Sequence, residues 1–480
     1  WHGVPFVMLV LAAGLASLPT EPFESAQIDG ATPWQTLRYL TIPMLRPVIM
    51  VVTIFSSYAL LRAFDTVFTL TSGGPARTTE TLSYHIYSRL FLGSQVGNSA
   101  AIGYILFIIT LVIVVILYRI FEESDSEAQP KSRKQFPLFR WVSQFFHAVA
   151  FVLSSALNIL VAIVSYPFNL VLNGLTRLIK ILFGREIGHK GRQRLGISLA
   201  LTVIAGWIIF SLFPVFWIYS SSLKEPADVF AIPPQWSFTP TLHNYEVVLG
   251  LKYGNEAELS MLGVNPPLSQ FPSRIVNSFI ISLSATALNL TFGILAAYAL
   301  VRLRLRKKRL ILVGMLVTRM VPPVMLVLPI FLLWRQLGLL GTYQGIIFGY
   351  MAFGLPFAIW MMRGYLIDIP VELEEAARVD GCSRLGAFFR IILPMAAPGV
   401  AATAVFLFIG SWNEFLFAII LGNNAIKTVT VEILGYVTDQ SILFGRLFAA
   451  SGLILLPSII FTIFVQRYIA SGLTGGAIKG

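Results

Sequence analysis

The segments PTEPFESAQIDGATPWQTLRYLTIPMLRP (residues 19–47) and PVELEEAARVDGCSRLGAFFRIILPMAAP (residues 370–398) are two copies of one pattern. At an offset of 351 residues, nine of their 29 positions are identical. Each copy has a proline that ends an apolar run, acidic residues that suit the first turn of a helix, and a glycine, Gly30 or Gly381, that suits its C-terminal cap. Helices shorter than about 12 residues are marginal in water, so each predicted helix needs a partner surface. The repeat indicates two homologous halves in one chain.

The composition around these segments excludes a water-soluble protein. The chain has 480 residues, of which 56% are hydrophobic and 12% charged. Soluble domains carry about 25% charged residues. With a mean hydropathy of +0.77, there are too few charged groups to solvate the surface of a soluble fold. The sequence therefore predicts an integral membrane protein.

Apolar runs long enough to cross a bilayer as helices give the fold class, since a span needs about 20 mostly apolar residues. The basic cluster at 302–309 places its loop on the cytoplasmic side, and counting crossings then makes both repeated segments cytoplasmic. The predicted spans cover residues 43–71, 99–121, 197–219, 273–301, 310–334, 343–366, 397–421 and 446–469, with residues 1–18 as a ninth, shortened span. We expect an all-α, polytopic membrane helix bundle.

The repeat register also predicts the domain organisation. Residues 1–121 form the C-terminal part of a first half, residues 122–196 a linker, and residues 197–480 a complete second half with six spans. The three spans between 197 and 334 have no counterpart ahead of residue 1, so we expect the N-terminal half to be truncated.

Several kinds of chemistry have no support in the sequence. A single cysteine, Cys382, and five scattered histidines give no zinc spacing, so no metal and no cofactor are expected. The formal charge of +12 fits basic cytoplasmic loops better than nucleic-acid binding, so no nucleic-acid partner is expected. GREIGHKG (184–191) lacks the spacing of a phosphate-binding loop, so we expect no ATP hydrolysis and no enzyme activity of the chain itself.

The repeated segments carry a family resemblance. ESAQIDGA (24–31) and EAARVDGC (375–382), each followed by a proline about a dozen residues later, resemble the EAA loop of permease subunits of binding-protein-dependent ABC importers. Four further stretches resemble the carbohydrate-uptake branch, of the maltose and glycerol-3-phosphate type: FDTVFTLTSGGP (64–75), SSLKEPADVF (221–230), AAYALVR (296–302) and SWNEF (411–415). The first half looks like the end of a first permease, and residues 197–480 look like a whole second permease. Ser25 and Cys382 stand where the family usually has alanine.

This resemblance implies type I importer permease halves in tandem, in a multi-pass protein of the bacterial inner membrane. It implies a separate ABC ATPase dimer on the cytoplasmic side and a periplasmic or lipid-anchored solute-binding protein outside. The outside segments 73–98 and 220–272, with Trp236, His243 and Tyr245, are large enough to receive that protein, although ordinary loop packing explains them equally well. The residues that inherit the ATPase-coupling role are Glu24, Ala26, Asp29, Gly30, Glu375, Ala377, Asp380 and Gly381.

Ionisable and polar groups inside spans point to a solute path, because a central charge costs at least ~2.5 kcal/mol. Asn413 and Glu414 lie beside Trp412 in the middle of a predicted span, and sugar sites combine aromatic faces with directed hydrogen bonds. Asp65 lies three residues after Arg62, so these two could simply neutralise each other. The substrate-path candidates are Asp65, Trp412, Asn413 and Glu414.

Three other polar groups within the spans have simpler interpretations. Arg319, ahead of Pro322 and Pro323, is expected to bind carbonyls freed by a broken helix. Asn277 and Asn289 are expected to form interhelical hydrogen bonds.

The linker must cross the membrane an even number of times, because both repeated segments are cytoplasmic. No charged residue occurs from Trp141 to Thr176, yet polar residues recur there at helical spacing. We expect two amphipathic helices lying in the cytoplasmic interface, and a membrane hairpin is the alternative.

Two other classes of protein remain to be weighed. An ion-coupled secondary transporter of a polar solute commonly has inverted repeats, whereas this repeat is parallel. A membrane enzyme needs convergent nucleophilic or metal-binding groups, and the sequence shows none. The sequence favours a sugar importer without specifying the sugar.

The topology makes a direct prediction. With Cys382 replaced by alanine, cysteines introduced at Ser132 and Gly188 should both react only with maleimide supplied from the cytoplasmic side. Labelling of the two positions from opposite sides would refute the even number of crossings.

Overall fold

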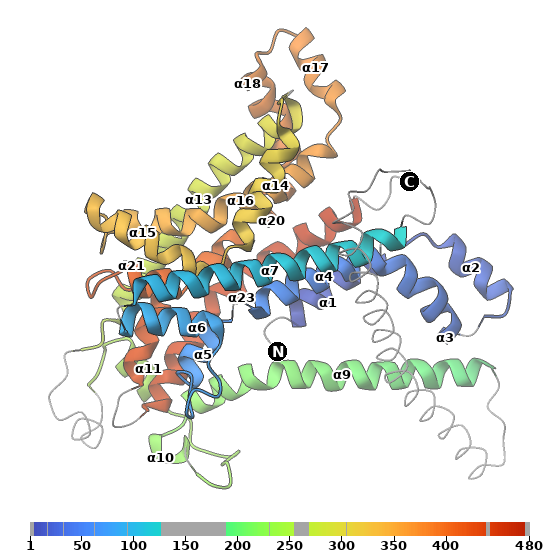
Figure 1. Cartoon of the computed structure of the whole chain (residues 1–480). Coiled ribbons are helices and arrows are strands. Elements are labelled where there is room, and N and C mark those ends of the chain that lie inside the picture. Colours follow the sequence, from blue (N-terminus) through green and yellow to red (C-terminus); the bar gives the residue numbers. More distant parts are fainter. Residues whose placement is uncertain are drawn as a thin grey trace, which may run out of the picture. The chain divides into compact units, whose positions relative to one another are not determined.

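The computed structural model describes most of the chain as helices (Figure 1). The described residues are 4–16, 18–31, 33–61, 63–93, 95–125, 189–229, 231–253, 268–303, 305–437 and 442–475. The two interfacial helices predicted in the linker lie outside the described residues, as does Arg62.

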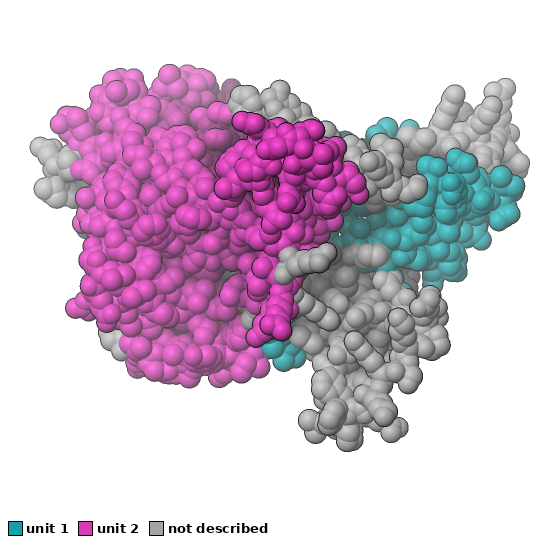
Figure 2. Space-filling view, turned by 90° about the horizontal axis from the view of Figure 1, so that it is seen from above, with its two compact units in different colours: residues 1–58, 111–216 teal, residues 59–110, 217–480 magenta. Residues whose placement is uncertain are grey.

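The chain forms two compact units, each built from two stretches of sequence (Figure 2). The first unit comprises residues 1–58 and 111–216, and the second comprises residues 59–110 and 217–480.

The first unit contains the first repeated segment. α1 packs on α4 so closely that a Cβ atom on Gly14 would lie 2.9 Å from the side chain of Val48. The elements ahead of residue 58 are α1 (Val4–Ala16), α2 (Glu21–Ile28), α3 (Pro33–Thr36), the π-helical turn η1 (Leu37–Thr41) and most of α4 (Ile42–Leu61). The unit also takes the end of α7 (Val96–Asp125) and most of α9 (His189–Ser222).

The second unit is organised around α13 (Phe271–Arg302), α16 (Tyr343–Ile367), α20 (Ala397–Trp412) and α23 (Phe444–Gly475). α13 and α16 cross where Gly293 faces Ala358, with no room for a Cβ atom on Gly293. The loop-side elements are α5 (Asp65–Leu70), α6 (Leu82–Tyr87), η2 (Ser88–Leu92), α10 (Pro226–Val229), α11 (His243–Val248), α21 (Leu416–Leu421), α22 (Val429–Glu432) and η5 (Ile433–Tyr436). Two further helices, α14 (Lys308–Met320) and α15 (Pro323–Leu337), precede α16.

The second repeated segment also lies in this unit, and Figure 1 shows it at one end of α13 and α16. It forms α17 (Val371–Val379), α18 (Arg384–Ala387), η4 (Phe388–Ile392) and α19 (Leu393–Met395). At the offset of 351 residues, α3 matches α18 and the π-helical turn η1 matches η4 residue for residue. The sequence repeat is therefore a repeat of local structure.

The fold confirms the predicted class, and five helices of the described part are long and apolar enough to span a membrane. α7 extends through Asp125 and α9 begins at His189, so both helices continue beyond the predicted spans at 99–121 and 197–219.

Three predicted spans are interrupted. The span predicted at 310–334 breaks after Met320, because Val321 precedes Pro322 and is driven into extended backbone. The spans predicted at 43–71 and 397–421 break after Leu61 and after Trp412. No proline marks either of these two breaks.

The two asparagines of α13 behave differently. Asn277 confirms its prediction, since its Nδ2 donates to the carbonyl of Lys427 at 3.1 Å and its Oδ1 accepts from Tyr343 Oη at 2.6 Å. Asn289 does not, because its fully buried side chain packs against Gly354 with no hydrogen-bond partner in the described part of the chain. The close helix crossing leaves space for the amide but supplies no donor or acceptor.

Candidate functional site

The two repeated segments end their first helices with the same backbone hydrogen bonds. In the first copy the amide of Ala31 donates to the carbonyl of Ala26 at 2.9 Å, and in the second Cys382 donates to Ala377 at 2.9 Å. Between them Gly30 has φ +73° and Gly381 has φ +88°, which L side chains rarely adopt. This is the glycine cap that the sequence predicted. Both loops are thus fixed in one backbone shape.

This shape turns most of the coupling candidates outward. Of the two alanines, Ala377 is buried at 4% exposure and Ala26 is half-buried. The exposed candidates are Glu24, Asp29, Gly30, Glu375, Asp380 and Gly381. One apolar side chain beside each glycine is also exposed, and at 86% exposure Ile28 and Val379 occupy equivalent positions of the repeat. Both loops therefore expose an apolar side chain at the same position of the repeat, next to acidic groups.

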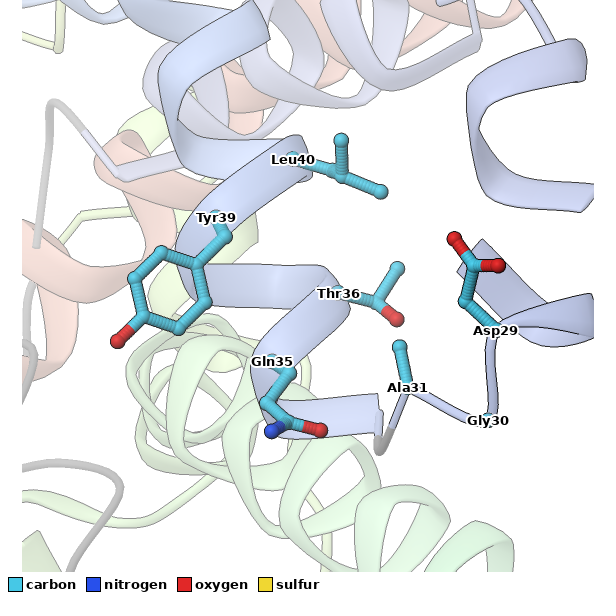
Figure 3. Close-up of a pocket in the computed structure, with 7 residues that line it drawn as sticks. All are labelled: Asp29, Gly30, Ala31, Gln35, Thr36, Tyr39 and Leu40. Carbon is cyan, nitrogen blue, oxygen red and sulfur yellow. The ribbon is translucent and has the colours of Figure 1, made fainter. Parts of the chain in front are cut away.

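A small open pocket adjoins the first of these loops (Figure 3). Its volume is about 360 Å³. In Figure 3 the side chains of Asp29 and Leu40 point toward each other across it, whereas the ring of Tyr39 points away. The pocket is lined by Asp29, Gly30, Ala31, Gln35, Thr36, Tyr39 and Leu40. It separates α2 from the following turn η1.

The second loop is held by a buried carboxylate that the sequence reasoning missed. Tyr298 Oη donates to Glu374 Oε1 at 2.6 Å, and Arg302 Nε lies 3.2 Å from Glu374 Oε2. The Arg302 and Glu374 side chains are each only 7% exposed. Arg302 Nη2 also donates to the carbonyl of Ile369 at 2.7 Å, just ahead of α17. These contacts fix α17 to the end of α13.

A sequence signal for this anchor did exist. Tyr298 and Arg302 are four residues apart in AAYALVR, so they share one face of a helix. The first copy has Phe23 at the position of Glu374 and lacks the carboxylate. The two loops therefore have the same backbone and different anchors.

The two helix breaks without a proline, after Leu61 and after Trp412, pack together in the second unit. Phe64 and Phe415 occupy equivalent positions of the repeat and precede α5 and α21 with closely similar backbone angles, φ −115° and ψ −56° against φ −119° and ψ −47°. Both rings are buried in one hydrophobic cluster, where Phe68 lies 5.4 Å from Phe415 between ring centroids. The structure thus brings together the two stretches that carry the substrate-path candidates.

The four candidates have different environments. The Glu414 carboxylate accepts from the amides of Phe417 at 2.9 Å and Ala418 at 3.2 Å, so it caps α21. Asn413 is exposed at the break, and Asp65 is exposed in the first turn of α5. Trp412 is 1% exposed, and its indole N–H donates to the carbonyl of Ile454 at 3.0 Å. In this structure Trp412 is part of the hydrophobic core, whereas the polar candidates lie at the helix breaks.

The expectation of one continuous helix through this region is wrong. α20 ends at Trp412, and Glu414 supplies acceptors for the first amides of the next helix, which an unbroken helix would bond internally. On the first half, the hydroxyl of Thr81 donates to the freed carbonyl of Ala63 at 3.0 Å. The breaks are stabilised by local side chains.

The outer segments are partly packed and partly exposed. Tyr245 Oη lies 2.8 Å from Ser222 Oγ, and His243 begins α11. Trp236 is 66% exposed and Ile232 is 97% exposed. Within the described ranges, no group of three or more His, Cys, Asp or Glu residues could hold a metal ion.

The cap on α21 predicts different effects for substitutions of Glu414 and of its neighbour Asn413. Glu414→Ala should lower the thermal unfolding midpoint, because loss of an N-terminal cap costs about 1 kcal/mol, whereas Asn413→Ala should leave the midpoint unchanged. Both variants should lower uptake across a sugar panel in proteoliposomes. Unchanged uptake in both would show that these groups only hold the helices together.

Comparisons with known proteins identify the family of the chain. The family model described as "Binding-protein-dependent transport system inner membrane component" matches residues 1–124 and 289–475. The probable ABC transporter permease protein y4oR of Sinorhizobium fredii is 35% identical over 268 residues, which cover 56% of this chain and 90% of the relative. The sulfoquinovosyl glycerol transport system permease protein SmoH of Agrobacterium fabrum is 34% identical, with 57% and 90% covered. The trehalose transport system permease protein SugB of Mycobacterium tuberculosis is 34% identical, with 58% and 95% covered.

A crystal structure of a bacterial ABC transporter that imports alginate was also matched. It is 24% identical, with 57% of this chain and 96% of that chain covered and a TM-score of 0.47. The family match spans both copies of the repeated segment and more than half of the residues. The chain belongs to the family of binding-protein-dependent transport system inner membrane components.

Proposed function

We propose that this chain is the transmembrane permease component of an ATP-driven sugar importer and that both of its EAA loops couple it to a separate ATPase dimer. The observation that carries the proposal is the duplicated loop. Residues 24–31 and 375–382 share the same hydrogen-bonded cap and expose an apolar side chain, Ile28 or Val379, at the same position. Two equal loops match the two equal clefts of a dimer.

The second loop is built to transmit a movement. Its helix α17 is tied to α13 by Glu374, so a displacement of α17 must move α13 or break a buried ion pair. α13 is about 48 Å long at 1.5 Å per residue. At its other end Arg274 Nη1 donates to the carbonyl of Ala425 at 2.9 Å and thereby holds the segment that follows α21. One rigid helix thus links the proposed ATPase-docking loop to the opposite end of the second unit.

A sugar is the solute that the observations support best. The relatives SmoH and SugB are named for transport of sulfoquinovosyl glycerol and trehalose. The polar groups at the paired breaks, Asp65 and Asn413, lie beside a cluster of aromatic rings, which suits a carbohydrate path. A periplasmic or lipid-anchored binding protein would deliver the solute to the outer segments.

The coupling role predicts that Gly381→Asp and Glu375→Lys abolish capture of the ATPase while the chain stays in the membrane. Glu375→Lys reverses an exposed charge on the docking face, and Gly381→Asp strains the left-handed cap. The measurement is the amount of ABC ATPase, by mass spectrometry, that copurifies with the tagged full chain from membranes. Arg306→Glu is the matched control, because it reverses an exposed charge in another predicted cytoplasmic loop. Wild-type levels of ATPase with both loop variants would contradict the coupling role.

A further inference from the structure

Arg319 is a charged residue in the last turn of α14, inside the span predicted at 310–334, and its structural role differs from the predicted one. It lies about 16 Å along α14 from Lys308 at 1.5 Å per residue, next to the predicted cytoplasmic boundary. The hydrocarbon core is about 30 Å thick, so the predicted span at 310–334 places Arg319 well inside this core. The sequence predicted that Arg319 would bind carbonyls freed at the helix break. The structure shows no such hydrogen bond from Arg319 in the described part of the chain.

Its guanidinium is instead held by an aromatic face. Arg319 Cζ lies 5.0 Å from the ring centroid of Phe357, in cation–π geometry. Phe357 in turn meets Phe406 edge to face, with ring centroids 6.2 Å apart and an interplanar angle of 79°. Three helices, α14, α16 and α20, thus build one cation-and-aromatic site.

Arg319 is on the protein-facing side of its helix. Leu312 and Met315 pack against the buried cluster that contains Met362, and Arg319 follows them at helical spacing. Leu310, by contrast, is 65% exposed on the other side. The guanidinium therefore faces the bundle and its five N–H groups are held away from the lipid.

A charge at this depth needs a reason. Burying an intramembrane charge is costly, and such residues usually mark a solute pathway. The ring face of Phe357 satisfies the cation only electrostatically and accepts none of its directed hydrogen bonds as a carboxylate or phosphate oxygen would. No carboxylate of the described residues pairs with Arg319, so its donors remain available to a passing solute.

We propose that Arg319, positioned by Phe357 and Phe406, contacts an anionic group of the transported sugar and sets a preference for acidic over neutral carbohydrates. The proposal rests on the proposed function, because it takes the chain to be a sugar importer. The guanidinium binds the acid group in a planar, two-pronged contact, and the aromatic pair offers an apolar face to the sugar ring.

The test compares one sugar in two charge states. Trigalacturonic acid and its fully methylated ester have the same rings, but only the acid carries carboxylates. In titration calorimetry, the detergent-purified full chain should bind the acid at least tenfold more tightly than the ester. Arg319→Gln should remove this preference and leave binding of the ester within twofold, and Arg306→Gln, an exposed loop charge, should change neither. Inorganic phosphate should compete weakly, because it lacks the ring.

Several results would overturn the assignment. The assignment is wrong if the wild type binds acid and ester equally or binds neither. It is also wrong if Arg319→Gln weakens binding of both equally, or if phosphate competes as strongly as the acid does. If Arg319→Gln is not recovered as a monodisperse protein, the Phe357→Leu variant is tested instead. Its ratio of acid affinity to ester affinity should fall threefold, and an unchanged ratio would contradict the assignment. Capture of the ATPase by the same preparation separates the role of Arg319 from the importer function. Failure to capture the ATPase counts against the importer function, whereas the sugar-binding results count only for or against the role of Arg319.

Discussion

The buried carboxylate of Glu374 is the constraint on which the second unit depends. A carboxylate removed from water must be paired and hydrogen-bonded, or the cost of burying it unfolds its surroundings. Tyr298 donates a hydrogen bond to one carboxylate oxygen and Arg302 forms an ion pair with the other, both from one face of α13, and these contacts tie α17 to that helix. The ring of Phe388, 4.8 Å from that of Tyr298 between centroids, closes the same contact from the following π-helical turn. The proposed coupling to an ATPase would need a loop that is held firmly on its inner side, and Glu374 supplies such a contact.

The membrane imposes the second constraint, because backbone groups freed at a helix break must find partners away from water. The chain meets it with side chains at each break: Glu414 caps α21, and Thr81 bonds the carbonyl of Ala63. These local solutions leave short helices and exposed polar residues at the breaks. The candidate solute path is therefore a consequence of how the breaks are stabilised.

Much of this architecture could be predicted from the sequence. The repeat fixed the register of α2 with α17, and Gly30 and Gly381 predicted caps that the structure contains. The apolar runs predicted the helices, and Pro322 marked the break between α14 and α15. These features are local, so a single sequence carries them.

The features that could not be predicted depend on contacts between distant residues. The breaks near Phe64 and Phe415 carry no proline, and their packing in one hydrophobic cluster joins residues far apart in the sequence. Pairing of Glu374 with Tyr298 joins residues 76 apart in the sequence. Arg319 was expected to serve its own helix, and only the crossing of α14 with α16 places it over Phe357. Asn289 lacks its expected partner for the same reason, since the neighbouring helix presents Gly354 there.

Amide hydrogen exchange of the full chain tests the anchor most directly, because it reports the free energy of local opening in α17. In a double-mutant cycle of Tyr298→Phe and Glu374→Gln, each single change should raise exchange across residues 371–379. The double change should raise exchange by less than the sum of the two single effects, because both changes act on the hydrogen bond between Tyr298 and Glu374. Exchange in residues 21–28, which lack this anchor, should stay constant. Fully additive effects of the two changes, or wild-type protection in both single variants, would contradict the account.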